Sequence, residues 1–472
     1  MSHRPMLSLI FVLCSGVVIS PVVFAFHASP ESGDGATSFP VETQLTAGPE
    51  GHRISNSNVW SPDSQWIVYD GRTGEDFNGS DIRRVNIETS GVQTLYSSPE
   101  GSHCGASFYH PRADYVTFIL SPKGPDPEWT YAASRRRGGL VDVRSPGECR
   151  SLDAMDYSAP FTPGALRGGS HVHVFSGDGQ LVSFTYEDEI LRQLDGREGA
   201  PPSQRNIGVL FPAGPVEVSP DHPHNSDGDY FSVQISETVA APVPGSDEIS
   251  RACENGWVGT GGYLKPDGTR QAYAVAFKGL VTAPDGTRHY EVFITDIPEG
   301  LVPEARPGTP LEGTLTQPPS PPRGIGQRRL TFTAGREYPG LQGPRHWLLS
   351  SPDGSQIAFL MKDQDGLPQL FSISPNGGEP RQISESPFGV SSAFSWSPDG
   401  RFIACARDNS IFITEVATGE DRRLTARSPD ETAPLPYACV FSPDGRHIAY
   451  ERLDADGNEQ IYIVSVPGAS GD

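Results

Sequence analysis

Several sequence features are scarce or absent, and each absence excludes a class of protein. The chain has 472 residues with 58 Asp and Glu against 36 Lys and Arg, so its formal net charge is −22. We therefore expect no binding to nucleic acid or to anionic membranes, because both select basic surfaces. No Gly-x-Ser-x-Gly elbow and no Gly-x-x-x-x-Gly-Lys-Ser/Thr loop occurs, so neither of these signatures of serine hydrolases and nucleotide hydrolases is present.

Cysteine is also scarce, with 6 residues in the whole chain. The five that lie beyond the N-terminal segment do not have the spacing of a disulfide framework or of a zinc site; they are Cys104, Cys149, Cys253, Cys405 and Cys439. We expect Cys405 and Cys439, which lie within apolar strand patterns, to be buried as small hydrophobic residues. A Cys104–Cys149 bridge is an open alternative to free thiols.

Long apolar runs are absent except near the N-terminus. Arg4 precedes an apolar run over residues 6–24, and the small residue Ala25 fits a cleavage site, as in a secretory signal peptide. We predict a signal peptide at 1–25, a flexible lead-in at 26–40 and no membrane span after cleavage. An uncleaved anchor is the alternative, since the run approaches the roughly 20 residues that span a bilayer. The predicted location is periplasmic or secreted.

A turn motif, Ser-Pro-Asp-Gly, recurs along the chain, and each copy is followed by a short apolar strand pattern. Three copies are complete and begin at Ser351, Ser397 and Ser442, and the weaker copies contain Pro62, Pro111, Gly177 and Pro220. Proline presets its own φ and glycine accepts a positive φ, so the motif reverses the chain between two strands. A repeat of roughly 45 residues built from short strands is typical of a β-propeller. We predict an all-β fold, a seven-bladed β-propeller over residues 41–472.

The interval between Pro220 and Pro352 holds more strand pattern than one blade needs. We predict an elaborated fourth blade at about residues 214–333. Eight blades are the alternative, because Lys265-Pro266-Asp267-Gly268 resembles a further copy of the motif.

The two ends of the chain are predicted to complete one blade together. The last repeat ends after its third strand, at residues 464–466, and residues 41–46 resemble the fourth strands of other repeats. An N-terminal strand that completes the C-terminal blade would close the ring and leave only short, protected edges.

Two groups of residues resemble known families. The repeats resemble those of TolB-like (PD40, WD40-like) propellers over almost the whole chain. Segments outside the repeats resemble the bacterial YidR-like proteins, a family of uncharacterised activity often labelled Tol-type biopolymer transport proteins; they are Asp153–Asp156, Pro160–His173, Pro244–Ala252, Gly256–Gly259 and Pro344–Trp347. We predict an exported, monomeric binding or scaffolding protein of the cell envelope and not an enzyme, with a protein partner or a carbohydrate ligand.

Histidines recur just before the turn motif. His171 and His346 lie six residues before the proline position of their repeats, and His103 lies eight before. The first strand of a blade lines the central channel, so these imidazoles are predicted to meet at its mouth and to bind a divalent metal, Mn or Zn. Alternatively, the histidines bond to neighbouring backbone and bind no metal.

This arrangement is similar to that of oligogalacturonate lyases, propeller enzymes in which histidines at the starts of inner strands hold a metal beside an acidic sugar. The match is partial, because only three repeats carry the histidine and its offset differs by about one residue. The resemblance implies an alternative function, a metal-dependent polysaccharide-active enzyme or an acidic-sugar-binding protein.

A further set of residues is predicted to bind the ligand. Its members are Arg167, Gly168, Gly169, His173, Arg251, Trp257 and Arg345. The arginines would neutralise an anionic ligand, and the two glycines would let the backbone approach a partner closely. Because His171 and His173 are two apart on a predicted strand, we expect both to project from one face. The alternative for the glycines is a plain connection between blades.

Overall fold

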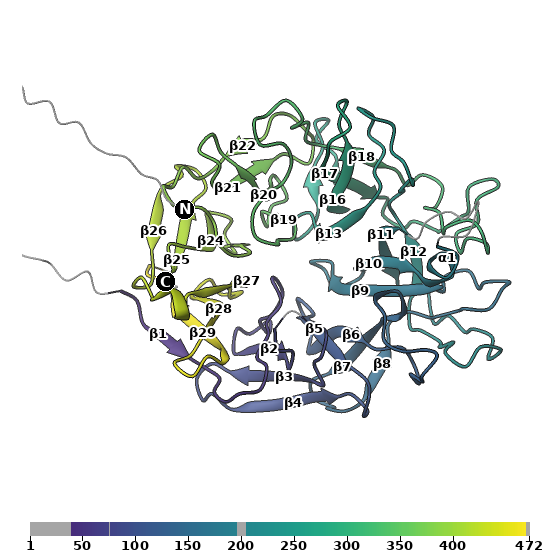
Figure 1. Cartoon of the computed structure of the whole chain (residues 1–472), viewed down its shortest axis with the longest axis horizontal. Coiled ribbons are helices and arrows are strands. Elements are labelled where there is room, and N and C mark those ends of the chain that lie inside the picture. The colour runs from purple at the N-terminus through teal and green to yellow at the C-terminus, as the bar shows by residue number, and fades with distance from the viewer. Residues whose placement is uncertain (1–38, 75, 196–203, 469–472) are drawn as a thin grey trace, which may run out of the picture. The chain divides into compact units, whose positions relative to one another are not determined.

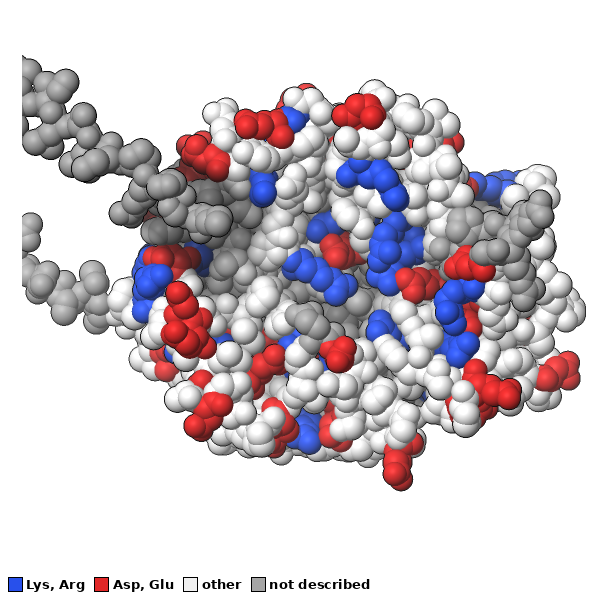
Figure 2. Space-filling model, in the orientation of Figure 1, with Lys and Arg blue, Asp and Glu red and all other residues white. Residues whose placement is uncertain are grey.

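The chain folds into a closed ring of seven antiparallel β-sheets around a central axis, as Figure 1 shows. The space-filling view in Figure 2 shows a hollow at the centre of the ring, which we call the channel. This is a computed structural model, and it describes residues 39–74, 76–195 and 204–468. The predicted all-β fold and the seven blades are confirmed. The predicted signal peptide at 1–25 and nearly all of the lead-in lie outside the described residues. Within the described residues, no helix is long and apolar enough to cross a membrane.

In each blade the first strand lies nearest the channel and the last at the rim (Figure 1). Blade one consists of β2 (Trp66–Asp70), β3 (Asp81–Asn86) and β4 (Val92–Ser97), with bridges from Arg53 and Trp60 at its inner edge. Blade two consists of β5 (Cys104–Tyr109), β6 (Tyr115–Leu120), β7 (Arg137–Asp142) and β8 (Cys149–Ser151). Blade three consists of β9 (Gly168–Phe175), β10 (Val182–Asp188), β11 (Arg205–Phe211) and β12 (Phe231–Gln234).

The remaining blades follow the same order. Blade four consists of β13 (Ala252–Trp257), β16 (Tyr273–Thr282), β17 (Arg288–Ile297) and β18 (Gln327–Arg329), with a side hairpin of β14 (Tyr263–Leu264) and β15 (Arg270–Gln271). Blade five consists of β19 (Leu349–Ser350), β20 (Ile357–Lys362), β21 (Pro368–Ile373) and β22 (Arg381–Gln382). Blade six consists of β23 (Ser395–Trp396), β24 (Phe402–Arg407), β25 (Ser410–Glu415) and β26 (Asp421–Arg423). The helices among the described residues are short: α1 (Glu189–Arg192) and the 3₁₀ turns at Ala133–Arg135 and Asp430–Thr432.

The seventh blade is built from both ends of the chain. It consists of β27 (Pro434–Phe441), β28 (His447–Leu453), β29 (Glu459–Ser465) and the N-terminal β1 (Glu42–Gln44). β1 pairs antiparallel with β29, with Thr43 opposite Ile463. The predicted closure of the ring is confirmed.

The Ser-Pro-Asp-Gly motif folds as a local hydrogen-bonded turn. In the last copy, Asp444 accepts from the hydroxyl of Ser442 and from the backbone N–H of Arg446. Such aspartate turns stabilise a reversal without help from the rest of the fold. The same bonds occur at Asp63, Asp178, Asp353 and Asp399.

The fourth blade differs from the prediction in its bounds. Pro220 lies in the loop between β11 and β12, which belong to blade three, so it does not follow an inner strand. Lys265–Gly268 forms the turn of the β14–β15 hairpin and does not mark an eighth blade. A Pro-Asp-Gly sequence therefore identifies a reversal, but not which two strands of a blade it connects.

The five cysteines among the described residues are free. Cys104 lies on β5 and Cys149 on β8, the inner and outer strands of blade two. Three strand spacings separate them, roughly 14 Å, whereas a disulfide needs Cα atoms within about 7 Å. The predicted alternative of a bridge between these two residues therefore does not fit this fold. Cys405 and Cys439 are buried, as predicted.

Candidate functional site

One mouth of the channel forms a cavity of about 360 Å³ whose charged lining residues are all arginines. Residues of five blades contribute to it. The arginines are Arg53, Arg72, Arg136 and Arg345, and the other lining residues are Ile54, Ser55, Asn56, Phe77, Ala106, Phe108, Ile119, Val172, Trp347, Pro436 and Tyr437. We call this the arginine cavity. Figure 2 shows basic side chains gathered around the central hollow, with many acidic side chains nearer the rim.

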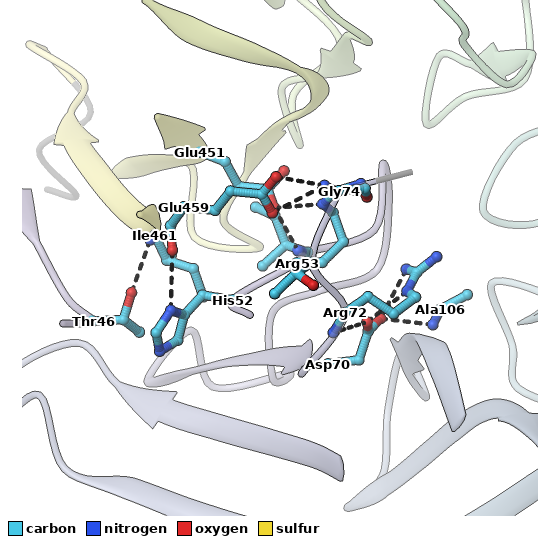
Figure 3. A network of polar contacts seen from close by, with 12 residues as sticks. Thr46, His52, Arg53, Asp70, Arg72, Gly74, Ala106, Glu451, Glu459 and Ile461 are labelled. Atoms are coloured by element: carbon cyan, nitrogen blue, oxygen red, sulfur yellow. Dashed lines mark hydrogen bonds and ion pairs between the residues drawn. The ribbon is translucent and has the colours of Figure 1, made fainter. Parts of the chain in front are cut away.

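Two of these arginines are held by carboxylates, as Figure 3 shows. The guanidinium of Arg53 donates to Glu459 at 2.9 Å and lies 3.5 Å over the ring of Tyr437. Arg72 donates to both oxygens of Asp70, at 2.6 and 2.9 Å. Bidentate pairs and stacking fix the plane of a guanidinium, so this side of the cavity is preorganised.

Arg345 is the most exposed of the four arginines. Its Nε is 3.0 Å from Glu254, which also pairs with Lys278 at 2.8 Å. The guanidinium is 4.7 Å over Trp347, and 66% of the side chain is accessible to solvent. A charge this exposed is available to a partner that approaches from outside.

Arg136 is the exception, because it has no ion-pair partner among the described residues. Its Nε donates to the hydroxyl of Tyr131 at 2.6 Å, and its Nη1 is 3.1 Å from Nδ1 of His171. Phe77 lies 4.4 Å away under the guanidinium. Glu187, the nearby acid, pairs with Arg205. Burial lowers the pKa of Arg136, so this charge is poorly compensated.

Three neighbouring inner strands carry the same backbone irregularity at the arginine cavity. Ala106, Val172 and Glu254 have φ of 53°, 56° and 55°, each at a bulge of β5, β9 or β13. A positive φ is unusual for residues other than glycine, above all for β-branched valine. Ala106 and Val172 line the cavity, and Glu254 holds Arg345. Strain that recurs at one place typically accompanies a functional site.

His346, a predicted metal ligand, uses both ring nitrogens within the fold. The backbone N–H of Leu360 donates to Nε2 at 3.1 Å, so Nδ1 carries the proton and donates to the carbonyl of Pro344 at 2.8 Å. Burial and the adjacent Lys278 ammonium lower its pKa to about 3. No lone pair is left for a metal.

The other two predicted ligands do not join His346. His171 accepts from Arg136 through Nδ1, and burial lowers its pKa well below the ordinary value. His103 packs edge-on against Tyr131, with ring centroids 5.9 Å apart. Among the described residues, no three His, Cys, Asp or Glu side chains form a group that could hold a metal. The structure therefore does not assemble the predicted metal site.

His173 is buried between blades and does not face the channel with His171. Its Nε2 is 3.0 Å from the hydroxyl of Ser170 and 3.3 Å from Asp153. The bulge at Val172 breaks the alternation that would have placed both histidines on one face. This Ser-His-Asp group is not a catalytic triad, because Asp153 contacts the serine and all three residues are fully buried.

Arg167, Gly168 and Gly169 serve the fold. Arg167 is 1% exposed, pairs with Asp188 at 2.7 Å and donates to the carbonyls of Thr314 and Gln317. A Cβ at Gly169 would lie 1.9 Å from the carbonyl oxygen of Ala133, and one at Gly168 would lie 2.2 Å from that of Glu187. The glycines do allow a close backbone approach, but to other segments of the same chain.

Arg251 and Trp257 lie outside the arginine cavity. Cys253 and Tyr290 are near the Arg251 side chain and raise its pKa against the effect of burial. Trp257 donates to the carbonyl of Val174 at 2.9 Å and lines a second cavity, of about 420 Å³, among the Pro-Asp-Gly turns. Of the predicted ligand-binding residues, only Arg345 lines the arginine cavity.

Sequence reasoning missed three of the four cavity arginines. Arg136 lies within the run Arg135-Arg136-Arg137, and such a run in an acidic chain was a detectable signal. Arg53 and Arg72 have no comparable signal. They come from blade one, where residues 53–60 form only isolated bridges and lack the strand pattern of the other inner strands.

Comparison with known proteins agrees with the propeller fold. The sequence model of a family described as a protein of unknown function (DUF3748) matches residues 103–226, and that of the dipeptidyl peptidase IV N-terminal region matches residues 376–471. An oligogalacturonate lyase in complex with manganese has a similar structure, with a TM-score of 0.53 and 13% identity over 92% of this chain and 95% of that one. A puromycin hydrolase has a TM-score of 0.50 and 13% identity over 89% of this chain and 52% of that one.

A relative from Escherichia coli is much more similar in sequence. This protein, named the uncharacterised protein YidR, is 44% identical over 410 residues, which cover 86% of this chain and 94% of the relative. The chain therefore belongs to the YidR family, as a seven-bladed β-propeller.

Proposed function

We propose that this protein is an exported binding protein of the cell envelope that holds an acidic ligand or partner at the arginine cavity. The observation that carries the proposal is the gathering of four arginines on one cavity in a chain with a formal net charge of −22. Arginine presents a planar fork that matches carboxylates and phosphates. A basic hollow within an acidic molecule attracts anions locally and repels them elsewhere.

Binding without catalysis is favoured by the chemistry of the cavity lining. The described lining contains no histidine, carboxylate or cysteine, whereas proton transfer and nucleophilic attack usually need one of these groups. Three of the arginines are already held by acidic partners, which suits rigid recognition.

A metal-dependent enzyme is less well supported. The oligogalacturonate lyase shares the fold of this chain at 13% sequence identity. A shared fold does not establish a shared activity. The two nitrogens of His346 are engaged in hydrogen bonds, and the three predicted histidines do not converge. Export is part of the proposal because the N-terminal residues have the pattern of a signal peptide.

Substitution of exposed arginines by alanine tests the proposal. The purified protein, immobilised through its C-terminus, would capture molecules from an envelope extract, with elution by salt and identification of both proteins and glycans. Arg345→Ala should abolish capture of the specific partner. Arg144→Ala is the matched control, because Arg144 is equally exposed, at 66%, and also pairs with a carboxylate, that of Asp142. Equal capture by the wild type and both variants would contradict the proposal.

A further inference from the structure

Arg136 has donors that are not used within the described part of the chain. An arginine carries five N–H donors. Tyr131 accepts from Nε and Nη2, and His171 accepts from Nη1. One N–H on each terminal nitrogen is left without an acceptor among the described residues. Two donors on adjacent nitrogens match the two oxygens of a carboxylate.

The positive charge of Arg136 also lacks an acidic partner among the described residues. Arg53, Arg72 and Arg345 each have an acidic partner, and Arg136 has only neutral ones among the described residues. A partly buried cation that lacks an anion costs stability. Such a cost is expected where a ligand supplies the missing charge, because binding sites trade stability for function.

The wall around Arg136 is mostly apolar. Phe77 stacks against its guanidinium, and Phe108, Ile119, Val172 and Trp347 line the same cavity. The cavity of about 360 Å³ lies at the small end of ligand sites, which range from about 300 to 1,000 Å³. Apolar walls favour a ligand body with few hydrogen-bonding groups. Ser55 and Asn56 are the neutral polar residues of the cavity lining apart from Tyr437 and Trp347, and they offer few partners for the many hydroxyls of a sugar.

We infer that the arginine cavity binds a carboxylate attached to a small apolar or aromatic group, with Arg136 as the anchor of the carboxylate. A free organic acid and the C-terminal residue of a peptide share this chemistry. The inference rests on the proposed function, because it names the ligand class of the same cavity. Val172 and Ala106, at their strained bulges, contribute the wall that faces the apolar group.

Calorimetric titration of the purified protein with 3-phenylpropionate tests the inference. The matched probes are 3-phenylpropionamide, which lacks the charge, acetate, which lacks the apolar group, and galacturonate, which has a polar body. We expect 3-phenylpropionate to bind at least about 10-fold more tightly than each of the three, since a charge-assisted pair and a buried ring are each worth more than about 1.4 kcal/mol. The peptide acetyl-Ala-Ala-Phe, with a free or an amidated C-terminus, distinguishes the two sources of the carboxylate.

Variants of Arg136 identify the anchor. Arg136→Gln should weaken 3-phenylpropionate binding about 10- to 100-fold. Arg136→Lys keeps the charge but not the fork, so it should bind several-fold more weakly than the wild type; it decides the matter if the glutamine variant does not fold. Arg136→Met should melt at a higher temperature than the ligand-free wild type, because it removes an uncompensated charge.

The inference is overturned if the amide binds as well as the acid, if galacturonate is preferred, or if Arg136→Gln binds unchanged. These outcomes are separate from the test of the proposed function. Capture that depends on Arg345, without any binding of the acids, would support the proposed function but reject this ligand class. Binding of the acids that depends on Arg136, without any captured partner, would retain the ligand class and reject a macromolecular partner.

Discussion

Glu451 lies fully buried beside Arg53, with 3.4 Å between its Oε1 and the Nε of the arginine. The pair joins the last blade to the first, and Glu451 also accepts from the backbone N–H of Ile54 at 3.0 Å. Burial raises the pKa of Glu451 from an ordinary 4.5 to about 8, although Arg53 opposes the shift. The junction of the ring therefore contains a carboxyl group that retains its proton in the native state near neutral pH.

This raised pKa predicts a specific pH dependence of stability. Between about pH 4.5 and 8, native Glu451 binds a proton that the unfolded chain releases, so its contribution to stability falls as the pH rises through that window. Glu451→Gln stays neutral and should escape the loss. The melting temperature of the variant relative to the wild type should rise by a few degrees from pH 5 to pH 8. Thermal melts at pH 5, 6.5 and 8 measure both proteins. A constant difference between their melting temperatures at the three pH values would contradict this prediction.

The N-terminal strand should contribute strongly to stability. Thr43 pairs with Ile463, the Thr46 hydroxyl accepts from the N–H of Ile461, and Leu45 is 3% exposed. Burial of one leucine side chain is worth about 1.5–3 kcal/mol. A chain that begins at residue 47 should melt several degrees lower than one that begins at residue 39, measured by calorimetry. Equal melting temperatures would mean that β1 does not hold the ring closed.

Arg167 should be important for stability and not for ligand binding. Its removal would take the Arg167 guanidinium away from the buried Asp188 and would release the carbonyls of Thr314 and Gln317. Loss of one partner of a buried pair costs about 3–5 kcal/mol. Arg167→Ala should therefore lower the free energy of unfolding by about that amount, measured in urea, and should make the loop around residue 314 sensitive to protease. The control is Arg323→Ala, because Arg323 forms an exposed pair with Glu304 and should change little.

Repeats and turns predicted the fold because they act locally, whereas the site depends on contacts distant in the sequence. Asp444 and Ser442 form their turn within three residues, so the motif is readable in one dimension. Arg53 belongs to the cavity because Glu459, about four hundred residues away, holds it, and no sequence pattern records that pairing. His173 was misplaced because the bulge at Val172 requires a positive φ in a valine, which neither propensity nor alternation predicts.

Gly169 tests whether the Arg-Gly-Gly segment is structural. A methyl group there would lie 1.9 Å from the carbonyl oxygen of Ala133, a backbone atom that cannot move without shifting the turn that begins there. Gly169→Ala should therefore lower the free energy of unfolding by about 1–3 kcal/mol or more. Because Arg136 follows the same turn, the variant should also weaken binding at the arginine cavity. Gly335→Ala is the control, since a methyl group at Gly335 would meet no atom within 4 Å. Wild-type stability in both variants would show that β9 has room beside Ala133 and that the glycines are retained for another reason.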